Sequence, residues 1–302
     1  MFVLAHLTDL HIGPLPRPRL AELASKRVLG WLNWRRNRRR CHRVEILTDL
    51  IADLAAQRPD HTAVTGDLVN LALPGEFAAT GAWLTAFGPP EDVSFVPGNH
   101  DAYVRTAVAQ WDRHWDAYMR GDREAGSGAG PRFPYVRRRG PVALVGLSSA
   151  VPTPAFMATG LIGRDQLAAV ETLLGRLGAA GLFRVVLLHH PPYRTPASHY
   201  KRLVDAAALR AVLARTGAEL VLHGHDHVHA LEWLDGPAGG IPVVGLPSSS
   251  AAPGGHHQAA AYNLYRIEGE AGAFRCEAVS RGFTADGVGV VEIARRRLLP
   301  PD

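Results

Sequence analysis

Short apolar runs alternate with stretches of helical periodicity along the first 230 residues. The apolar runs predict strands at residues 2–8, 62–65, 93–96, 142–147, 183–188 and 220–222. Helical spacing of apolar positions predicts helices at residues 44–57, 76–87, 104–115, 166–177 and 204–215. Residues 231–302 differ, with short predicted strands at 242–246, 260–267, 274–279 and 288–293. This order predicts an α/β protein whose C-terminal part is β-rich, arranged as one domain over residues 1–302.

The stretch between the first strand and helix 44–57 breaks this pattern. We call residues 14–42 the basic segment, and we expect it to be an insertion. Its apolar positions recur at helical spacing with Lys26 and Arg27 off their face, and they are Leu20, Leu23, Ala24, Val28, Trp31 and Leu32. Residues 17–43 contain ten Lys or Arg and one acid, Glu22, a local net charge of +9 against +5 for the whole chain. The high isoelectric point therefore belongs to this segment rather than to the rest of the chain.

Three interpretations of the basic segment remain open. It is a solvated surface helix, or an amphipathic helix that lies on anionic lipid or covers a lipid-like substrate, as Trp31 and Trp34 beside arginines favour. The third is a nucleic-acid contact, which is the weakest because no further basic face is evident.

Composition sets the remaining limits. The 302 residues are 47% hydrophobic and 20% charged, as in soluble globular proteins. The two cysteines, Cys41 and Cys276, make no disulfide framework, which favours a reducing compartment. The N-terminus lacks the basic flank of a signal peptide, and no apolar run approaches the ~20 residues of a membrane span. We therefore expect a cytoplasmic protein, with peripheral attachment to the inner face of the membrane as the alternative. The sequence does not indicate its oligomeric state.

Polar motifs follow the predicted strands where each strand ends. Gly98-Asn99-His100-Asp101 follows strand 93–96, and the same position is held elsewhere by Asp9-Leu10-His11, Gly66-Asp67, His189-His190 and Gly224-His225-Asp226-His227. Ligand sites in α/β sheets lie beyond the carboxyl ends of the strands, so these groups are expected to converge. The candidate metal ligands are Asp9, His11, Asp67, Asn99, His189, His225 and His227. Such mixed imidazole, amide and carboxylate donors suit two Mn²⁺, Fe²⁺/Fe³⁺ or Zn²⁺ ions, with Asp67 the natural bridge.

Two cations ~3.5–4 Å apart could bind phosphoryl oxygens and convert a bridging water to hydroxide. The hydroxide would attack phosphorus in line, and His100 would protonate the departing alkoxide. Either His189 or His190 could ligate, and the strand register favours His189. Tyr193, His199 and Tyr200 follow the His-Pro-Pro turn and are predicted to contact substrate, with simple loop packing as the equal alternative. The histidines that lack a partner pattern are expected to be ordinary, and they include His6, His42, His61 and His114.

The ordered set of motifs, with His189-x-Pro191 and Gly224-His225-x-His227 as its last members, resembles the calcineurin-like metallophosphoesterases. The likeness covers residues 1 to about 230 and is greatest to the class III cyclic-nucleotide phosphodiesterase-like branch. It implies a four-layer α-β-β-α sandwich of two mixed β-sheets flanked by helices. It also implies one metal ion held by Asp9, His11, Asp67 and His227, and another held by Asp67, Asn99, His189 and His225.

Two departures from this family bear on function. Many relatives have an aspartate three residues after the bridging aspartate and then Arg-Gly, whereas this chain has Asn70-Leu71. The missing acid leaves open what orients His100, and the missing arginine counts against a phosphoprotein phosphatase. The basic segment also counts against a cyclic-nucleotide substrate.

We therefore expect a dinuclear metal-dependent phosphodiesterase that hydrolyses a small or lipid-linked phosphodiester. The alternatives are a pyrophosphatase acting on a nucleotide-linked lipid, a nuclease, and a non-catalytic scaffold. Contact of residues 17–43 with an anionic membrane is an open alternative, and nucleic acid is not an expected partner.

Overall fold

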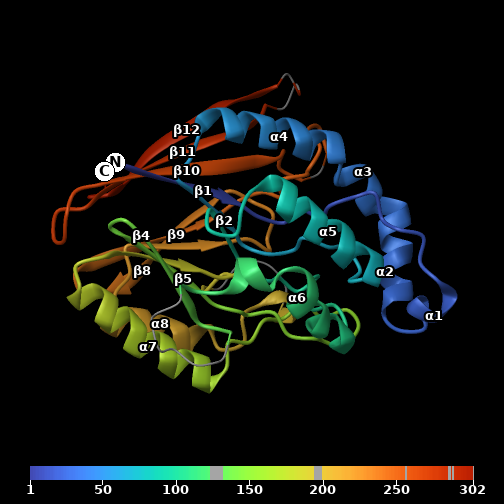
Figure 1. Cartoon of the computed structure of the whole chain (residues 1–302), viewed down its shortest axis with the longest axis horizontal. Coiled ribbons are helices and arrows are strands. Elements are labelled where there is room, and N and C mark those ends of the chain that lie inside the picture. Colours follow the sequence, from blue (N-terminus) through green and yellow to red (C-terminus); the bar gives the residue numbers. More distant parts are fainter. Residues whose placement is uncertain (123–131, 194–198, 256, 285–286, 288, 302) are drawn as a thin grey trace.

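The strands form where runs of branched aliphatic residues can be buried on both faces, as in β6 (Phe183–Leu187) and β5 (Val142–Gly146), whose residues are all buried. The computed structural model describes residues 1–122, 132–193, 199–255, 257–284, 287 and 289–301. Its strands form two six-stranded sheets (Figure 1). The first has the order β12 (Val290–Leu299), β11 (Arg275–Phe283), β10 (Ala261–Glu268), β1 (Phe2–Leu7), β2 (His61–Val64) and β3 (Val93–Phe95). The second has the order β4 (Tyr135–Arg139), β5, β6, β7 (Leu220–His223), β9 (Gly239–Gly245) and β8 (Ala230–Gly236).

Both sheets are mixed. In the first, β1 pairs parallel with β2, with Ala5 opposite Thr62, and antiparallel with β10, with Ala5 opposite Leu264. In the second, β5, β6, β7 and β9 run parallel, while β4 and β8 are antiparallel edge strands. The parallel strands therefore end at one edge of each sheet.

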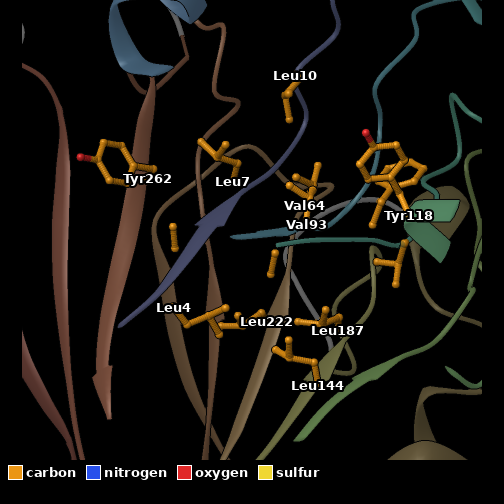
Figure 2. Close-up of a cluster of buried hydrophobic side chains, with 14 of the residues drawn as sticks. Leu4, Leu7, Leu10, Val64, Val93, Tyr118, Leu144, Leu187, Leu222 and Tyr262 are labelled. Carbon is orange, nitrogen blue, oxygen red and sulfur yellow. The ribbon is translucent and has the colours of Figure 1, made fainter. Parts of the chain in front are cut away.

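Helices cover the outer faces of the sheets. α4 (Val44–Gln57) packs on the first sheet against β10 and β12, and α5 (Pro74–Phe87) packs with α6 (Val108–His114). α7 (Arg164–Ala179) and α8 (Ala206–Thr216) lie side by side on the second sheet (Figure 1). Figure 2 shows buried side chains of both sheets in one cluster, among them Leu4 of β1 and Leu222 of β7. The predicted four-layer sandwich of two mixed sheets is confirmed.

The basic segment lies between β1 and α4, but it is not the single helix that its periodicity predicts. It contains α1 (Leu20–Leu23), α2 (Arg27–Asn33), a π-helical turn (Trp34–Arg38) and α3 (Arg39–Cys41), which project beyond the sheets (Figure 1). The predicted apolar face is not buried, because Leu20 is 89% exposed whereas Arg27 is only 9% exposed. Arg27 is buried because its guanidinium donates hydrogen bonds to the carbonyl oxygens of Leu71 (3.0 Å) and Ala72. Among the described residues, no helix has both the length and the apolar character that a membrane span requires.

Candidate metal centre

The loops that follow five parallel strands bring together all seven predicted metal ligands. Asp9 and His11 follow β1, Asp67 follows β2, and Asn99 follows β3. The second sheet contributes three histidines through the loops after β6 and β7, and they are His189, His225 and His227.

The two aspartates lie at the centre of this group. His227 Nε2 lies 3.0 Å from Asp9 Oδ1, and His11 Nε2 lies 4.0 Å from Asp9 Oδ1 and 3.9 Å from Asp67 Oδ2. The Oδ2 atom of Asp9 accepts hydrogen bonds from Thr8 Oγ1 (2.8 Å) and from the backbone N–H of His225 (2.9 Å). Asp9, His11 and Asp67 offer ligand atoms within 4.8 Å of one another, which is the spacing of a cation site.

A second group of donors surrounds Asn99. Its side-chain oxygen lies 3.1 Å from His189 Nε2 and 2.8 Å from His225 Nδ1, and His189 Nε2 is also 3.4 Å from Asp67 Oδ2. The outer nitrogens of these rings face backbone oxygens, because His189 Nδ1 lies 2.7 Å from Thr65 O and His225 Nε2 lies 2.9 Å from Lys201 O. Burial lowers the pKa of His225 well below its ordinary value, so this ring is neutral, carries one proton and cannot donate to an oxygen from both nitrogens. A cation among the inner atoms satisfies them, and the donor set therefore fits a metal ion.

His11 is oriented in the same way. Its Nδ1 lies 3.1 Å from the carbonyl oxygen of Val69, so that Nε2 faces the aspartates. Hydrogen bonds of this kind fix the ring and the tautomer of metal-ligating histidines.

Charge in the centre is unevenly balanced. Burial opposes ionisation of Asp9, but His227 and His189 beside it hold the pKa of the Asp9 carboxyl below its ordinary value. Burial also opposes a charge on His189, yet Asp67 and Asp9 raise its pKa to about 10. Two buried carboxylates thus favour positive charge at this position, which is what a divalent cation supplies.

Five of the seven candidate ligands have a left-handed backbone. The φ angles are +50° at Asp9, +41° at His11, +57° at Asp67, +75° at His225 and +55° at His227. Side chains rarely adopt this region except where surrounding structure imposes it, and such residues cluster at functional sites.

Asp101 joins the loops that carry Asp67 and Asn99. Its Oδ2 accepts the backbone N–H groups of Asp67 (2.7 Å) and Gly98 (2.8 Å), and its Oδ1 accepts those of Leu68 (3.0 Å) and Val69 (3.2 Å). One buried carboxylate therefore fixes the distance between the two loops.

His100 lies beside the centre and is oriented by backbone rather than by a side chain. Its Nδ1 lies 2.6 Å from the carbonyl oxygen of Asn70, and its own N–H donates to Asp67 Oδ1 (2.8 Å). The Asn70 side chain instead donates to Ile12 O (3.3 Å). Burial and the charge of Arg38 lower the pKa of His100 to about 3. The question that the missing aspartate left open is thus answered by the main chain of Asn70.

Sequence reasoning missed two residues of the basic segment. Arg38 Nη1 lies 2.7 Å from His100 Nε2, and Arg38 Nη2 lies 2.8 Å from His11 Nε2. His42, expected to be ordinary, has its ring 4.5 Å from the ring of His11 and belongs with His11 and His227 to a second group of close ligand atoms. Hydrogen bonding of His42 Nδ1 to Ser250 Oγ (3.0 Å) holds it there. The sequence signal for these two residues is their spacing: Arg38 and His42 lie four residues apart, which places them on the same face of a helix.

The neighbouring histidine and the predicted substrate contacts have other partners. His190 Nδ1 contacts Ser149 Oγ (2.8 Å) and its Nε2 contacts Ala158 O (3.1 Å), so both of its nitrogens point away from the centre. The Tyr193 hydroxyl contacts His223 Nε2 (3.0 Å), His199 contacts Arg202, and Tyr200 is exposed. None of Tyr193, His199 and Tyr200 lines the cleft described below, and a contact with substrate stays a prediction.

Four of the candidate ligands, Asp67, Asn99, His225 and His227, line a cleft of about 1010 Å³. The basic segment contributes Lys26, Arg36 and Arg40 to the lining, and the loop before α7 contributes Phe156 and Met157. The walls therefore combine positive charge with apolar surface.

Known proteins agree with this architecture. A dimetal phosphatase from Danio rerio superposes with a TM-score of 0.65 at 14% identity, over 97% of this chain and 98% of that one. The purple acid phosphatase PPD1 of yellow lupin (Lupinus luteus) has a TM-score of 0.54 at 12% identity, over 95% of this chain and 52% of that one. The sulfate thiohydrolase SoxB of Thermus thermophilus has a TM-score of 0.51 at 18% identity, over 91% of this chain and 55% of that one. At these identities the likeness concerns the fold.

A search of the curated proteins finds no significant match. The family model for calcineurin-like phosphoesterases matches residues 2–229, which include every motif of the candidate centre. The chain therefore belongs to the calcineurin-like phosphoesterase family.

Proposed function

We propose that this protein is a dinuclear metal-dependent phosphodiesterase that acts on a small or lipid-linked phosphodiester. The observation that carries the proposal is the convergence of seven oxygen and nitrogen donors around the Asp9 and Asp67 carboxylates. One cation would be held by Asp9, His11, Asp67 and His227, and the other by Asp67, Asn99, His189 and His225. When bound, such ions act as Lewis acids toward phosphoryl oxygens and activate water at neutral pH.

The remaining chemistry falls to residues of the chain. Asp67 would be shared by the two cations, and Asp101 keeps its loop at a fixed distance from Asn99. Since His100 Nδ1 is engaged by the carbonyl of Asn70, Nε2 is the atom that would hold the proton for the leaving alkoxide. That atom now faces Arg38, so protonation of Nε2 requires Arg38 to change partner.

The cleft supports a substrate with both an anionic and an apolar part. Lys26, Arg36 and Arg40 suit phosphate oxygens, and Phe156, which is 86% exposed, and Leu29 offer apolar surface at the same cleft. The cleft is also large enough for a second phosphate, which supports a pyrophosphatase of a nucleotide-linked lipid as the second candidate. Exposed Leu20 on the basic segment supports contact with an anionic membrane.

The first test is Mn²⁺-dependent hydrolysis of bis-p-nitrophenyl phosphate compared with p-nitrophenyl phosphate, with Asn99→Ala as the matched inactive variant. Diester turnover that depends on Asn99 is the expected result. A preference for the monoester would make the protein a phosphatase, and metal content well below stoichiometric would indicate a scaffold. Faster turnover of a nucleoside diphosphate lipid than of any diester would favour the second candidate.

Membrane contact is tested separately by flotation with vesicles of phosphatidylglycerol or of phosphatidylcholine. Binding to the anionic vesicles alone, lost in a Leu20→Ser/Phe156→Ser double variant, is expected. Equal flotation of the double variant and the wild type would argue against a role for these two side chains.

A further inference from the structure

The guanidinium of Arg38 reaches the candidate metal centre from the basic segment, and Arg38 lines the cleft. It donates from Nη2 to His11 Nε2 (2.8 Å) and lies with Nη1 2.7 Å from His100 Nε2. Arg38 ends the π-helical turn Trp34–Arg38, and such turns often occur at functional sites because they redirect side chains. The nearby Arg35 points elsewhere, with its guanidinium 4.8 Å from the Trp31 ring.

The chain on both sides of Arg38 is held by hydrogen bonds to the body of the protein. Before it, Arg27 donates to Leu71 O (3.0 Å). After it, the backbone N–H of Arg43 donates to Ser250 O (2.9 Å), and that of Ala252 donates to Cys41 O (2.8 Å). The fold therefore sets the backbone position from which the Arg38 side chain reaches His11 and His100.

The favourable charge partners of Arg38 are the Asp67 and Asp9 carboxylates, which are also candidate metal ligands. Within the part of the chain that the structure describes, Arg38 forms no ion pair with a carboxylate, and its shortest side-chain contacts are with two imidazole nitrogens, His100 Nε2 and His11 Nε2. Both nitrogens have another task in the proposed function, because His11 would bind a cation and His100 would carry a proton. The guanidinium is thus free to take another partner, and its planar fork matches two oxygens of one phosphoryl group.

We propose that Arg38 is a substrate-binding residue that holds the non-bridging oxygens of the phosphoryl group during hydrolysis. The identity of the ligand rests on the proposed function, whereas the anion site itself rests on the placement of Arg38. The basic segment would then complete the reaction site as well as form its wall.

The first experiment measures binding of inorganic phosphate to the Mn²⁺-loaded protein by isothermal titration calorimetry, with metal content determined on the same samples. The Arg38→Ala variant should bind phosphate about 10-fold to 100-fold more weakly than the wild type, because it lacks one charge-assisted pair. Arg38→Lys should retain part of the affinity. Arg39→Ala removes the same charge from the adjacent exposed residue and should bind phosphate as the wild type does. Wild-type affinity in Arg38→Ala, or loss of metal together with phosphate, would overturn the proposal.

The second experiment measures hydrolysis of bis-p-nitrophenyl phosphate. Arg38→Ala should lower kcat/KM by about 100-fold, as expected when one donor to a developing charge is removed. Added guanidinium ion should restore part of the activity of Arg38→Ala and none of that of Asn99→Ala. Unchanged kcat/KM in Arg38→Ala would refute the role of Arg38 and leave the proposed function standing. If the wild type hydrolyses no diester, the proposed function fails, and the phosphate titration alone decides the role of Arg38.

Discussion

The substitution Asp101→Asn tests how the candidate centre is held together. Asp101 is fully buried, and each of its oxygens accepts two backbone N–H groups from the loops that carry Asp67 and Asn99. Asparagine has the same shape but replaces one oxygen with an NH₂ group, which is a donor. Because both oxygens are in use, either orientation of the amide leaves two backbone donors facing another donor.

The magnitude follows from those two donors. Each lost hydrogen bond costs about 1 kcal/mol, and each buried donor left without an acceptor adds about 1 kcal/mol or more, so unfolding free energy should fall by about 4 kcal/mol. Since the same bonds set the distance between Asp67 and Asn99, Mn²⁺ affinity should fall by about 10-fold or more, as it does when outer partners of metal ligands are removed.

Urea denaturation of metal-free protein and calorimetric titration with Mn²⁺ measure the two effects. Asp205→Asn is a matched control, because Asp205 Oδ2 accepts from both Ile162 N (3.1 Å) and Gly163 N (2.8 Å). One orientation of the new amide keeps both bonds, so the control should lose about 1 kcal/mol or less and bind Mn²⁺ normally. Equal denaturation midpoints and Mn²⁺ affinities for Asp101→Asn and the wild type would refute the reasoning.

Three further predictions concern packing, pH and metal. Gly66→Ala should abolish the centre, because a Cβ there would contact the His189 ring and lie 2.8 Å from the backbone nitrogen of Gly98, at a φ of +104°. Gly175→Ala, where a Cβ meets nothing within 4 Å, should be as soluble as the wild type and bind metal normally. Burial lowers the pKa of His61 to about 3, below the value of about 6.5 in an unfolded chain, so the unfolded state gains a proton first as pH falls. His61→Gln should therefore lose about 2 kcal/mol less unfolding free energy than the wild type between pH 7.5 and 5, and parallel curves in urea denaturation would contradict this. Mn²⁺ at about 100 times its Kd should raise unfolding free energy by about 2.7 kcal/mol, an increase that chelation with EDTA reverses in thermal melts.

Much of the fold could be predicted because the parallel strands are buried on both faces and appear as plain apolar runs. Two edge strands were not predicted from the sequence. β4 (Tyr135–Arg139) ends in three arginines, and β8 (Ala230–Gly236) has acidic residues and an exposed face, so neither has the composition of a buried strand. β12 extends to Leu299 through charged residues, whose pattern is not that of a buried strand. Edge strands tolerate such side chains because one side faces solvent.

The candidate ligands could be predicted because each directly follows a strand, and parallel strands end together. Contacts made by main-chain atoms could not be predicted in this way. The carbonyl oxygen of Asn70 orients His100, and every residue type has such an oxygen. Arg38 and His42 were missed because the basic segment buries Arg27 and exposes apolar residues such as Leu20. This is the opposite of the face that its apolar spacing predicts to be buried.

The left-handed backbone at five candidate ligands has a thermodynamic consequence for the whole protein. That conformation costs roughly 1–2 kcal/mol for each residue with a side chain, so holding all five consumes an amount comparable to the net stability of many domains. The remainder of the sandwich must supply this energy before any ion or substrate arrives. Cations then meet donors whose conformational freedom folding has already removed, and their binding need not reorganise the chain. Glycine at Asp9 or Asp67 would relieve the backbone, but it would also leave the backbone N–H of His225 or of His100 without its acceptor, so the chain cannot shed this cost without losing the centre.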